Sequence, residues 1–511
     1  MKKRIKTGRA MILLCAAATL TALTGAGADN IRPQSNPFGA TPSPEREARG
    51  IDIPMQGVDC LPTLVHGISG TGPEAPFNSE FIRSLHVWDD GNGPALYVVG
   101  TFESINGVPA RNIAKWDGST WSALDVGVGT PGTFESAWAL AVFDDGTGEK
   151  LYVGGDFAFA GNNVPGTARV AKWDGTQWLA GGTAGTPMAG GVAAMAVGDL
   201  GAGPRIFVAG PIMGRVYQSS GGTFSPITGN FGSPANPYAM EVFTVNGVSY
   251  LYVGGDFSGI GGITSRNLVR YNGTAWSGGG QTNQFGTIRA LRTHVNETGA
   301  ALYAGGLFTS IGNVNASRIA RLQPNQSMNW QPVGTGLSGY PGCPSCQLVV
   351  YDITSFDDGL GPALYIAGNF PTVGGVDAHG VAKWQNGQWH AVYEGNLTGG
   401  SPGGATYSYT IHGHNGNPAC NPLTPAGQPA LFFSGNFTHI NGVLNRRIAM
   451  LQGCGEFNPA DLNGDGSIDV LDLLALLSAW GPCTAACCAA DLNNDAVVDV
   501  LDLLILLANW G

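Results

Sequence analysis

One short phrase recurs seven times in this 511-residue chain and constrains its fold more than any other feature. In its clearest copies it reads Leu-Tyr-Val-Gly-Gly-x-Phe. The copies begin, with small variations, at Leu96, Leu151, Ile206, Leu251, Leu302, Leu364 and Leu431. Successive copies lie 45 to 67 residues apart, and such a period indicates an architecture built from similar supersecondary units.

Each repeat unit predicts four short strands. In the second unit an apolar run from 140 to 143 leads into the turn 144–146, and the strand at Leu151 follows. A third strand is expected over 170–173, and a fourth opens at Trp178. Asp-Gly between alternating apolar runs is a strong hairpin signal. Seven such units predict an all-β fold, a seven-bladed β-propeller over residues 56–455.

The order Leu-Tyr-Val-Gly-Gly, aromatic-Asp and Trp resembles the kelch type of propeller repeat. The last unit ends one strand short, after 448–451, and residues 60–64 align with the missing strand. We therefore expect the N-terminal strand to complete the seventh blade, which closes the ring and removes an open sheet edge. In this alignment Cys60 and Cys454 lie beside one hairpin position, and we predict a disulfide between them.

Residues that recur in every blade are interpreted as structural, because each blade must meet the same packing and backbone requirements. The recurring glycines predict close backbone approach; they are Gly100, Gly155, Gly210, Gly255, Gly306, Gly368 and Gly435. The recurring aromatic residues predict packing between blades; they are Phe102, Phe157, Phe257, Phe308, Phe370, Phe437, Trp121, Trp178, Trp276 and Trp389. Six arginines near the third strands favour a structural role over a sialidase-like cluster; they are Arg111, Arg169, Arg215, Arg266, Arg318 and Arg447.

A second motif occurs twice near the C-terminus, beginning at Asp461 and Asp491. Its oxygen-bearing positions follow the 1, 3, 5, 7, 9, 12 spacing of a calcium loop, because a hard cation takes six to eight oxygens. The predicted ligands are Asp461, Asn463, Asp465, Ser467, Asp469 and Asp472 in the first copy, and Asp491, Asn493, Asp495, Val497, Asp499 and Asp502 in the second. At loop position 6 the first copy has Gly466, which permits a sharp turn, whereas the second copy has Ala496. The second site is therefore expected to be weaker.

Two such loops, each followed by one Leu-rich helix, resemble the dockerin family over residues 456–511. The resemblance implies calcium-dependent folding and docking onto a cohesin-like or other surface receptor. The partner-choice positions are Val470, Leu471, Val500 and Leu501. Better-known dockerins place polar residues there, and the alternative is that these apolar side chains pack the two helices together or against the neighbouring domain.

The N-terminus predicts export. Five basic residues precede the apolar run 11–23, and the small-x-small sequence 26–28 offers a cleavage site after Ala28, as in a secretory signal peptide. Residues 29–55 are predicted to be a disordered segment. No later stretch is long and apolar enough to span a bilayer. We expect a secreted protein, extracellular or at a cell surface.

Charge and cysteine content narrow the partners. The formal net charge is -11, and removal of residues 1–28 would bring it to about -16, which argues against binding nucleic acid through overall charge. Cysteines in an oxidising compartment are expected to pair. Local pairs are predicted for Cys343 with Cys346 and for Cys483 with Cys487 or Cys488, while Cys420 has no assigned partner; zinc is the alternative at Cys343 and Cys346.

Function is expected where the repeat is broken: in blade three, in the insertion 412–428, and in the loop that holds Tyr340. His412 and His414 could begin a metal site, although no third ligand is identifiable. No catalytic residues are assigned, because acidic residues gather in hairpin turns. The favoured hypothesis is a non-catalytic propeller that binds a glycan or protein surface. The alternatives are a secreted polysaccharide-degrading enzyme, glycosidase or lyase, and a structural surface protein.

Overall fold

The structure is a computed structural model. It describes residues 63–65, 68, 72–74, 80–182, 190–211, 213–296, 299–324, 328–339, 347–393, 397–398, 408–414, 423, 428–453, 460, 462, 468–483, 490–493 and 495–510. The predicted signal peptide and the 29–55 segment lie outside these residues. So do Tyr340, Cys60, Cys343, Cys346, Cys420, Cys454, Cys487, Cys488, Asp461, Asn463, Asp465 and Ser467.

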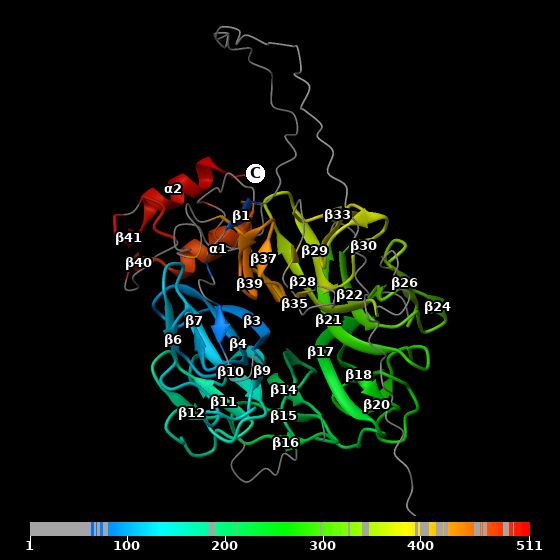
Figure 1. Cartoon of the computed structure of the whole chain (residues 1–511). Coiled ribbons are helices and arrows are strands. Elements are labelled where there is room, and N and C mark those ends of the chain that lie inside the picture. The colour runs from blue at the N-terminus through cyan, green and yellow to red at the C-terminus, as the bar shows by residue number, and fades with distance from the viewer. Residues whose placement is uncertain are drawn as a thin grey trace, which may run out of the picture. The chain divides into compact units, whose positions relative to one another are not determined.

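The part of the chain that the structure describes contains seven antiparallel sheets of four strands each (Figure 1). Their first strands are β3 (Phe81–Asp89), β9 (Ala137–Asp144), β13 (Ala194–Asp199), β17 (Ala235–Val245), β21 (Thr287–Asn296), β28 (Val349–Asp357) and β35 (Ser408–His414). Each first strand contacts the first strand of the next sheet, and β35 contacts β3, so these strands form a closed ring. The predicted all-β propeller fold is confirmed.

The repeated phrase forms the second strand of every sheet. These strands are β4 (Pro94–Thr101), β10 (Glu149–Gly155), β14 (Pro204–Ala209), β18 (Val248–Phe257), β22 (Gly299–Leu307), β29 (Pro362–Asn369) and β36 (Ala430–Gly435). The third strands are β7 (Ile113–Trp116), β11 (Val170–Trp173), β15 (Tyr217–Ser219), β19 (Leu268–Tyr271), β25 (Ile319–Leu322), β32 (Val381–Gln385) and β39 (Ile448–Gln452). Most residues of the second strands are buried on both faces, which explains their continuous apolar sequence.

The fourth strand of the last sheet comes from the other end of the chain. Six fourth strands follow in sequence: β8 (Trp121–Ala123), β12 (Trp178–Ala180), β16 (Ser225–Pro226), β20 (Trp276–Gly278), β26 (Trp330–Pro332) and β33 (Gln388–Ala391). The seventh is β1 (Thr63–Val65), which pairs antiparallel with β39, placing Leu64 opposite Leu451. The predicted closure by the N-terminal strand is confirmed.

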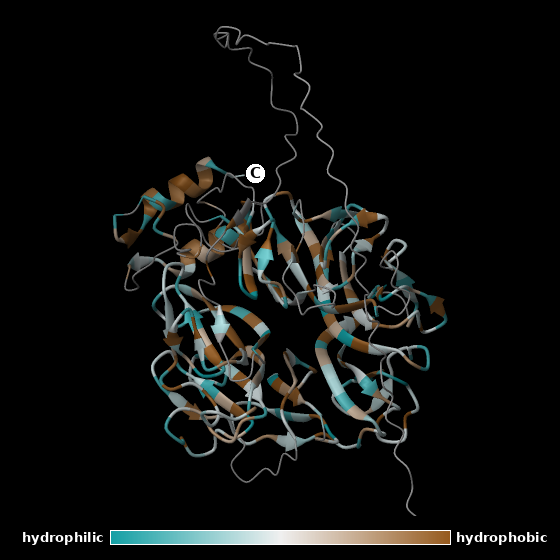
Figure 2. Ribbon diagram, in the orientation of Figure 1, coloured by the Kyte–Doolittle hydropathy of each residue, from teal (hydrophilic) through white to brown (hydrophobic). Residues whose placement is uncertain are grey.

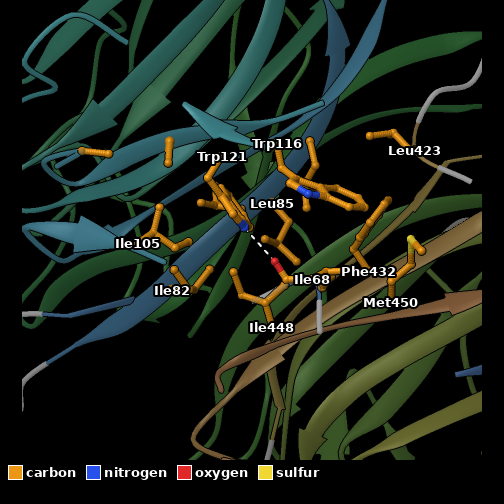
Figure 3. Close-up of a cluster of buried hydrophobic side chains, with 14 of the residues drawn as sticks. Ile68, Ile82, Leu85, Ile105, Trp116, Trp121, Leu423, Phe432, Ile448 and Met450 are labelled. Atoms are coloured by element: carbon orange, nitrogen blue, oxygen red, sulfur yellow. Dashed lines mark hydrogen bonds between the residues drawn. The ribbon is translucent and has the colours of Figure 1, made fainter. Parts of the chain in front are cut away.

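The core at this closure joins the first and last sheets. Buried Ile82 and Leu85 of β3 belong to the same cluster as Phe432 of β36 and Met450 of β39 (Figure 3). Burial of about ten such side chains, each contributing about 1.5–3 kcal/mol, holds the first and last sheets together.

The recurring tryptophans connect neighbouring sheets, as predicted. The indole N–H of Trp178 donates to the Leu124 carbonyl at 3.0 Å, and that of Trp276 donates to the Thr228 carbonyl at 2.7 Å. Trp121 and Trp389 donate in the same way to residues more than fifty positions earlier. The recurring phenylalanines are at most 1% exposed. In the sheets whose fourth strand begins with one of these tryptophans, the indole ring and its hydrogen bond thus fasten the sheet to the preceding segment.

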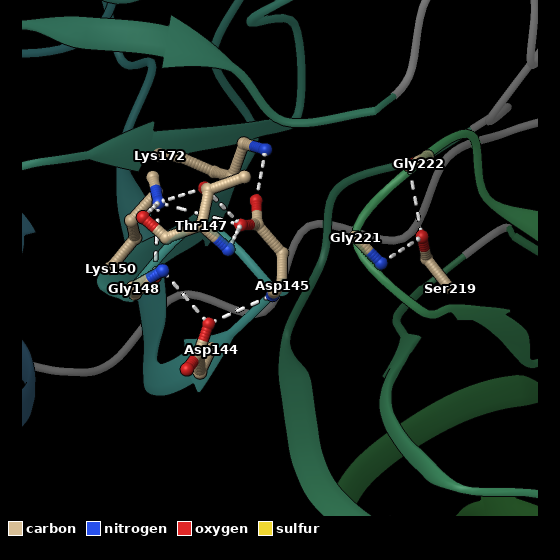
Figure 4. Close-up of polar contacts among 10 residues, drawn as sticks. Asp144, Asp145, Thr147, Gly148, Lys150, Lys172, Ser219, Gly221 and Gly222 are labelled. Carbon is tan, nitrogen blue, oxygen red and sulfur yellow. Dashed lines mark hydrogen bonds and ion pairs between the residues drawn. The ribbon is translucent and has the colours of Figure 1, made fainter.

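The paired aspartates in the hairpin turns are structural. The Asp144 carboxylate accepts hydrogen bonds from the N–H groups of Gly146 and Gly148, while Asp145 pairs with Lys172 at 2.8 Å (Figure 4). Asp90 and Asp358 repeat this pairing with Lys115 and Lys383. The prediction that acidic residues serve turns is confirmed at these positions.

Short hairpins, which the sequence patterns did not predict, follow many second strands. They are formed by β5 (Ser104–Ile105) with β6 (Val108–Pro109), β23 (Ser310–Ile311) with β24 (Val314–Asn315), β30 (Thr372–Val373) with β31 (Val376–Asp377), and β37 (His439–Ile440) with β38 (Val443–Leu444). Three of them pair with an edge strand that precedes the first strand of the same unit: β2 (Pro73–Glu74), β27 (Leu337–Ser338) and β34 (Leu397–Thr398).

The C-terminal region contains α1 (Val470–Ser478) and α2 (Val500–Ala508), as expected after each loop, and a short ladder of β40 (Gly481–Pro482) with β41 (Val497–Val498). Its small core includes Ile468, Leu476, Val498 and Leu506. Among the described residues, no helix has the length and apolar character needed to cross a membrane.

Candidate functional site: the mouth of the central channel

The recurring glycines lie beside irregularities at the start of the first strands. In the fifth sheet Gly306 pairs with Ile288 and the next pair is Gly305 with Ala290, so Arg289 is left without a partner. A Cβ atom on Gly306 would lie 2.0 Å from the Thr287 carbonyl oxygen. The glycine therefore permits the close approach that this β-bulge requires.

The same bulge recurs around the ring. Register shifts leave unpaired Arg83 in β3, Trp138 in β9, Tyr238 in β17, Arg289 in β21, Tyr351 in β28 and Tyr409 in β35. Cβ atoms on Gly100, Gly155, Gly210, Gly255 and Gly368 would likewise come within 2.3 Å of a carbonyl oxygen of the neighbouring segment. The predicted close approach is confirmed at these glycines, and its consequence is a ring of re-aimed side chains.

Five of these bulged residues, Arg83, Trp138, Tyr238, Arg289 and Tyr351, line a cavity of about 390 Å³ at the mouth of the channel. Every first strand, or the residue just before it, contributes to the lining. The described bulged side chains are exposed or half-buried, whereas the residues just before them, such as Ile82 and Ile288, are buried. The repeat thus builds a constant frame that presents a variable bulged residue from each of five blades to a shared space.

Three aromatic rings and two guanidinium groups dominate the described lining. Trp138, Tyr238 and Tyr351 supply the rings, and Arg83 and Arg289 supply the positive charges. The Arg289 Cζ atom lies 3.9 Å from the centroid of the Tyr238 ring, a close cation–π contact. Ala193 takes the corresponding place in the third blade, so that blade contributes a small side chain there.

Asp352 is the carboxylate in the described lining of the cavity. Its oxygens accept hydrogen bonds from the Thr410 hydroxyl at 2.6 Å and from the backbone N–H groups of Ile411 and Ile353 at 3.0 and 2.8 Å. Burial raises the pKa of Asp352 above its ordinary value, although these donors and Arg292 oppose the shift. A second carboxylate to work with it as an acid–base pair is not found among the described lining residues.

A layer of histidines lies farther along the first strands. The rings of His86 and His412 have centroids 4.8 Å apart, and the His412 Nε2 atom accepts a hydrogen bond from the Val87 N–H at 3.1 Å. Burial, followed by the charge of Arg292, lowers the pKa of His86 to about 4. Burial also lowers the pKa of His414 to about 4. These rings are therefore neutral at neutral pH.

The structure corrects the expected place of two histidines. His412 and His414 belong to strand β35 and not to a loop insertion. The His412 side chain packs against His86 of the neighbouring first strand. In the described part of the chain, no group of three or more His, Cys, Asp or Glu side chains is arranged to hold a metal ion.

Sequence reasoning searched the breaks in the repeat and so missed the bulged residues. A signal was present: after alignment of the units, one column holds Arg83, Trp138, Ala193, Tyr238, Arg289, Tyr351 and Tyr409. In most units the next residue is small and the one after it is Leu, Met or Ile. A column of variable, large residues inside a constant frame marks the positions that the scaffold leaves free.

The recurring arginines near the third strands make separate contacts. Arg111 donates to the Gly129 carbonyl at 2.8 Å, and Arg318 donates to the Leu348 carbonyl at 2.7 Å. Arg447 pairs with Glu80 at 2.8 Å, and Arg169 pairs with Asp156. These contacts to loops favour the structural interpretation.

The second calcium loop is described except for residue 494. Asp502 is fully buried, and its oxygens accept from the N–H groups of Asn493 at 3.1 Å and Asp499 at 2.8 Å. Asp491 is 6% exposed and accepts from the N–H groups of Asp495 and Ala496. Ala496 has a φ of 71°, the left-handed conformation that favours glycine.

The donor set of these loops fits a divalent cation. No Lys, Arg or His follows Arg447 in the sequence, whereas the segment from 453 onward contains Glu456 and eight aspartates. Asp472 and Asp502 are nonetheless fully buried. Because burial of carboxylates is costly without a compensating positive charge, a bound cation accounts for this arrangement better than any side chain of the segment.

The helices present apolar residues outward. Val470, Leu471, Val500 and Leu501 are 50–55% exposed. About half of each side chain faces solvent, which favours the interpretation as a partner-binding surface, while packing of the helices together or against the neighbouring domain stays the alternative. Further exposed apolar residues repeat at the same 30-residue spacing: Leu474 with Leu504, Leu477 with Leu507, and Trp480 with Trp510. Figure 2 shows the hydrophobic character of both helices.

Cys483 is disulfide-bonded. Its predicted partners, Cys487 and Cys488, lie outside the described residues, so the pairing stays a prediction. The same holds for Cys60 with Cys454 and for Cys343 with Cys346.

Comparison with known proteins identifies two segments. Residues 459–509 match the Dockerin type I domain, and residues 302–327 match a beta-propeller domain of unknown function, DUF5122. No curated protein matches the chain. The kelch subtype stays a prediction.

Solved structures with similar folds share little sequence with this chain. The RRP9 WD40 repeats are 12% identical, with a TM-score of 0.43 over 75% of this chain and 99% of that one. An ancestral GH74 enzyme is 15% identical, with a TM-score of 0.43 over 72% of this chain and 45% of that one. YCF48 from Cyanidioschyzon merolae is 12% identical, with a TM-score of 0.38 over 74% and 98%. These similarities say nothing about the function of this chain.

Proposed function

We propose that this is an exported propeller that binds a glycan at the mouth of its channel without cleaving it, and that its C-terminal module tethers it to a cohesin-like receptor. The ring of bulged aromatic and arginine residues carries the first part of the proposal. Aromatic faces stack on the apolar faces of sugar rings, and polar groups beside them fix the orientation.

The carboxylates support binding over hydrolysis. Glycosidases that use two carboxylates need both beside the scissile bond. Asp352 is engaged by Thr410, Ile411 and Ile353, and the described lining supplies no second carboxylate. A polysaccharide-degrading enzyme remains the competing hypothesis, and product release distinguishes the two.

The test uses the purified mature protein and a panel of insoluble polysaccharides. We expect protein to be lost from solution with at least one polysaccharide, without new sugar ends. Tyr238→Ala and Tyr351→Ala should each weaken that binding about tenfold, since a central aromatic contact is worth more than 1 kcal/mol. Leu360→Ala, in the exposed turn after β28, is the control. Release of sugar ends would contradict the proposal.

The tail is proposed to bind calcium and a cohesin-like partner. Dockerin domains bind cohesins, and in this chain the exposed positions 470, 471, 500 and 501 supply two equivalent apolar faces. Bound calcium would supply the positive charge that the buried aspartates need. Leu471→Asp combined with Leu501→Asp should abolish capture by an immobilised cohesin domain and leave polysaccharide binding intact. Unchanged capture would show that the partner surface lies elsewhere.

A further inference from the structure

Positive charge gathers at the channel mouth of an otherwise acidic protein. The whole chain carries a formal charge of -11, yet Arg83 and Arg289 line the mouth. Arg292 lies on the same strand as Arg289, three residues farther on. Within the described residues, no ion pair involves Arg289 or Arg292.

The closest contacts of these two arginines are with uncharged groups, and the charge of Arg292 also acts on the Asp352 carboxylate. The Arg289 guanidinium lies over the Tyr238 ring, and Arg292 Nε donates to the Ile353 carbonyl at 3.2 Å. A guanidinium stacked on a ring keeps its edge free to donate to a planar anion. Arg289 thus offers oriented donors next to an aromatic platform.

Among the described lining residues one carboxylate, that of Asp352, faces two guanidinium groups, so the lining keeps a net positive charge even when Asp352 is ionised. Asp352 is satisfied by three donors, and burial raises its pKa. Burial lowers the pKa of His412 well below its ordinary value, with Arg292 and the other histidines acting in the same direction. Glu241 lies on β17, beyond the mouth residues, where it accepts from the Thr293 N–H at 2.9 Å.

We propose that the mouth selects glycans that carry anionic groups, with Arg289 binding the carboxylate or sulfate while Tyr238 and its neighbours stack on the sugar ring. This inference rests on the proposed glycan-binding function. The inference narrows the ligand to glycans with carboxylate or sulfate groups. The aromatic residues alone would bind neutral and anionic sugars equally well.

The test compares three soluble polysaccharides by titration calorimetry: a neutral galactan, polygalacturonate and a sulfated galactan. We expect at least one anionic polymer to bind about tenfold more tightly than the neutral one. Which anionic polymer binds identifies carboxylate or sulfate as the recognised group. Higher salt should weaken binding of that polymer, because counterions screen exposed charges, and leave the neutral polymer unaffected.

Two variants of Arg289 and one control make the test specific. Arg289→Gln should remove about tenfold of the affinity for the anionic polymer and change the neutral affinity less than about twofold. Arg289→Lys should retain part of the preference, which a misfolded variant would not. Arg205→Gln, on β14 away from the mouth, should have no effect.

The outcomes separate this inference from the proposed function. Equal binding of neutral and anionic polymers, or a preference that survives Arg289→Gln, would overturn the inference and leave glycan binding standing. Failure of every polymer, soluble or insoluble, to bind the wild-type protein would overturn the proposed function itself.

Discussion

Two kinds of residue stand side by side in the first two strands of the blades: glycines that the backbone geometry requires, and bulged residues whose side chains reach the cavity. Gly306 and its equivalents are fixed because any Cβ atom would meet a backbone carbonyl. The bulged residues next to them face open space, so the scaffold tolerates Arg, Trp, Ala or Tyr there. The same local geometry thus explains both the constant column and the variable one.

Replacement of Gly306 should be costly. Gly306→Ala would place a methyl group 2.0 Å from the Thr287 oxygen, and the displaced backbone should lower the free energy of unfolding by about 3 kcal/mol. Urea unfolding measures this loss. Gly222→Ala is the matched control, because Gly222 is exposed and has no atom within 4 Å of its Cβ position; its effect should stay within about 0.5 kcal/mol. Equal losses would refute the close-approach argument.

The buried histidines should make stability depend on pH. His294 is 2% exposed, its Nδ1 atom lies 2.8 Å from the Ser355 hydroxyl, and burial lowers its pKa from 6.5 to about 4. Between pH 6.5 and 4 the unfolded chain binds a proton that the folded chain does not, so the free energy of unfolding falls as pH falls.

His294→Gln should flatten that dependence. Denaturant unfolding of wild type and variant at several pH values measures the difference, which should narrow from pH 6.5 toward pH 4. Above pH 7 the two curves should run parallel, because the histidine is then neutral in both states. A constant difference down to pH 4 would mean that His294 does not titrate as described.

At the scale of elements, the two C-terminal helices are copies with the same N-terminal device. Asp469 caps α1 and Asp472 reaches back to its N–H, while Asp499 and Asp502 do the same for α2. These aspartates are also predicted calcium ligands, so the same side chains would both cap the helix and bind the ion. In the sequence, the second loop has Ala496 where the first has Gly466.

Restoring the glycine should strengthen the second site. Ala496→Gly relieves a left-handed alanine at a gain of about 1 kcal/mol, which corresponds to about fivefold tighter calcium binding. Calorimetric titration of the full chain with calcium measures both sites. The first site, which already has Gly466, should be unchanged and serves as the internal reference. No change at either site would show that Ala496 does not limit binding.

At the scale of the whole molecule, the ring depends on its closure. The β1–β39 ladder brings residues 63–65 against 450–452, and the cluster in Figure 3 packs behind it. Thr63 pairs with Gln452 at the end of this ladder that is nearer in sequence to Cys60 and Cys454, whose disulfide stays a prediction. A disulfide there would close a loop of nearly the entire propeller.

Removal of that disulfide should destabilise the protein by up to about 5 kcal/mol, the chain-entropy estimate for so long a loop. Cys60→Ser, Cys454→Ser and the double variant should lose the same amount, because each breaks the same bond. Thermal or denaturant unfolding under oxidising conditions measures this. Additive losses would mean that the two cysteines do not pair.

Much of the architecture could be read from the sequence because it depends on local and repeated chemistry. The Leu-Tyr-Val strands, the Asp-Gly hairpins and the helices after each loop were all predicted and appear in the structure. Even the closure followed from counting strands, since a missing fourth strand left an unpaired edge that residues 60–64 could fill.

The candidate site required the tertiary structure. Arg83, Trp138, Tyr238, Arg289 and Tyr351 are separated by up to nearly three hundred residues, and only the closed ring brings them to one cavity. Their side chains also point into this cavity because of the bulges. Each bulge shifts the pairing register by one residue, and the alternation of apolar and polar residues in the sequence does not reveal that shift. Local patterning therefore determined the blades and the helical tail, whereas the mouth exists only because seven strand ends converge on a common axis.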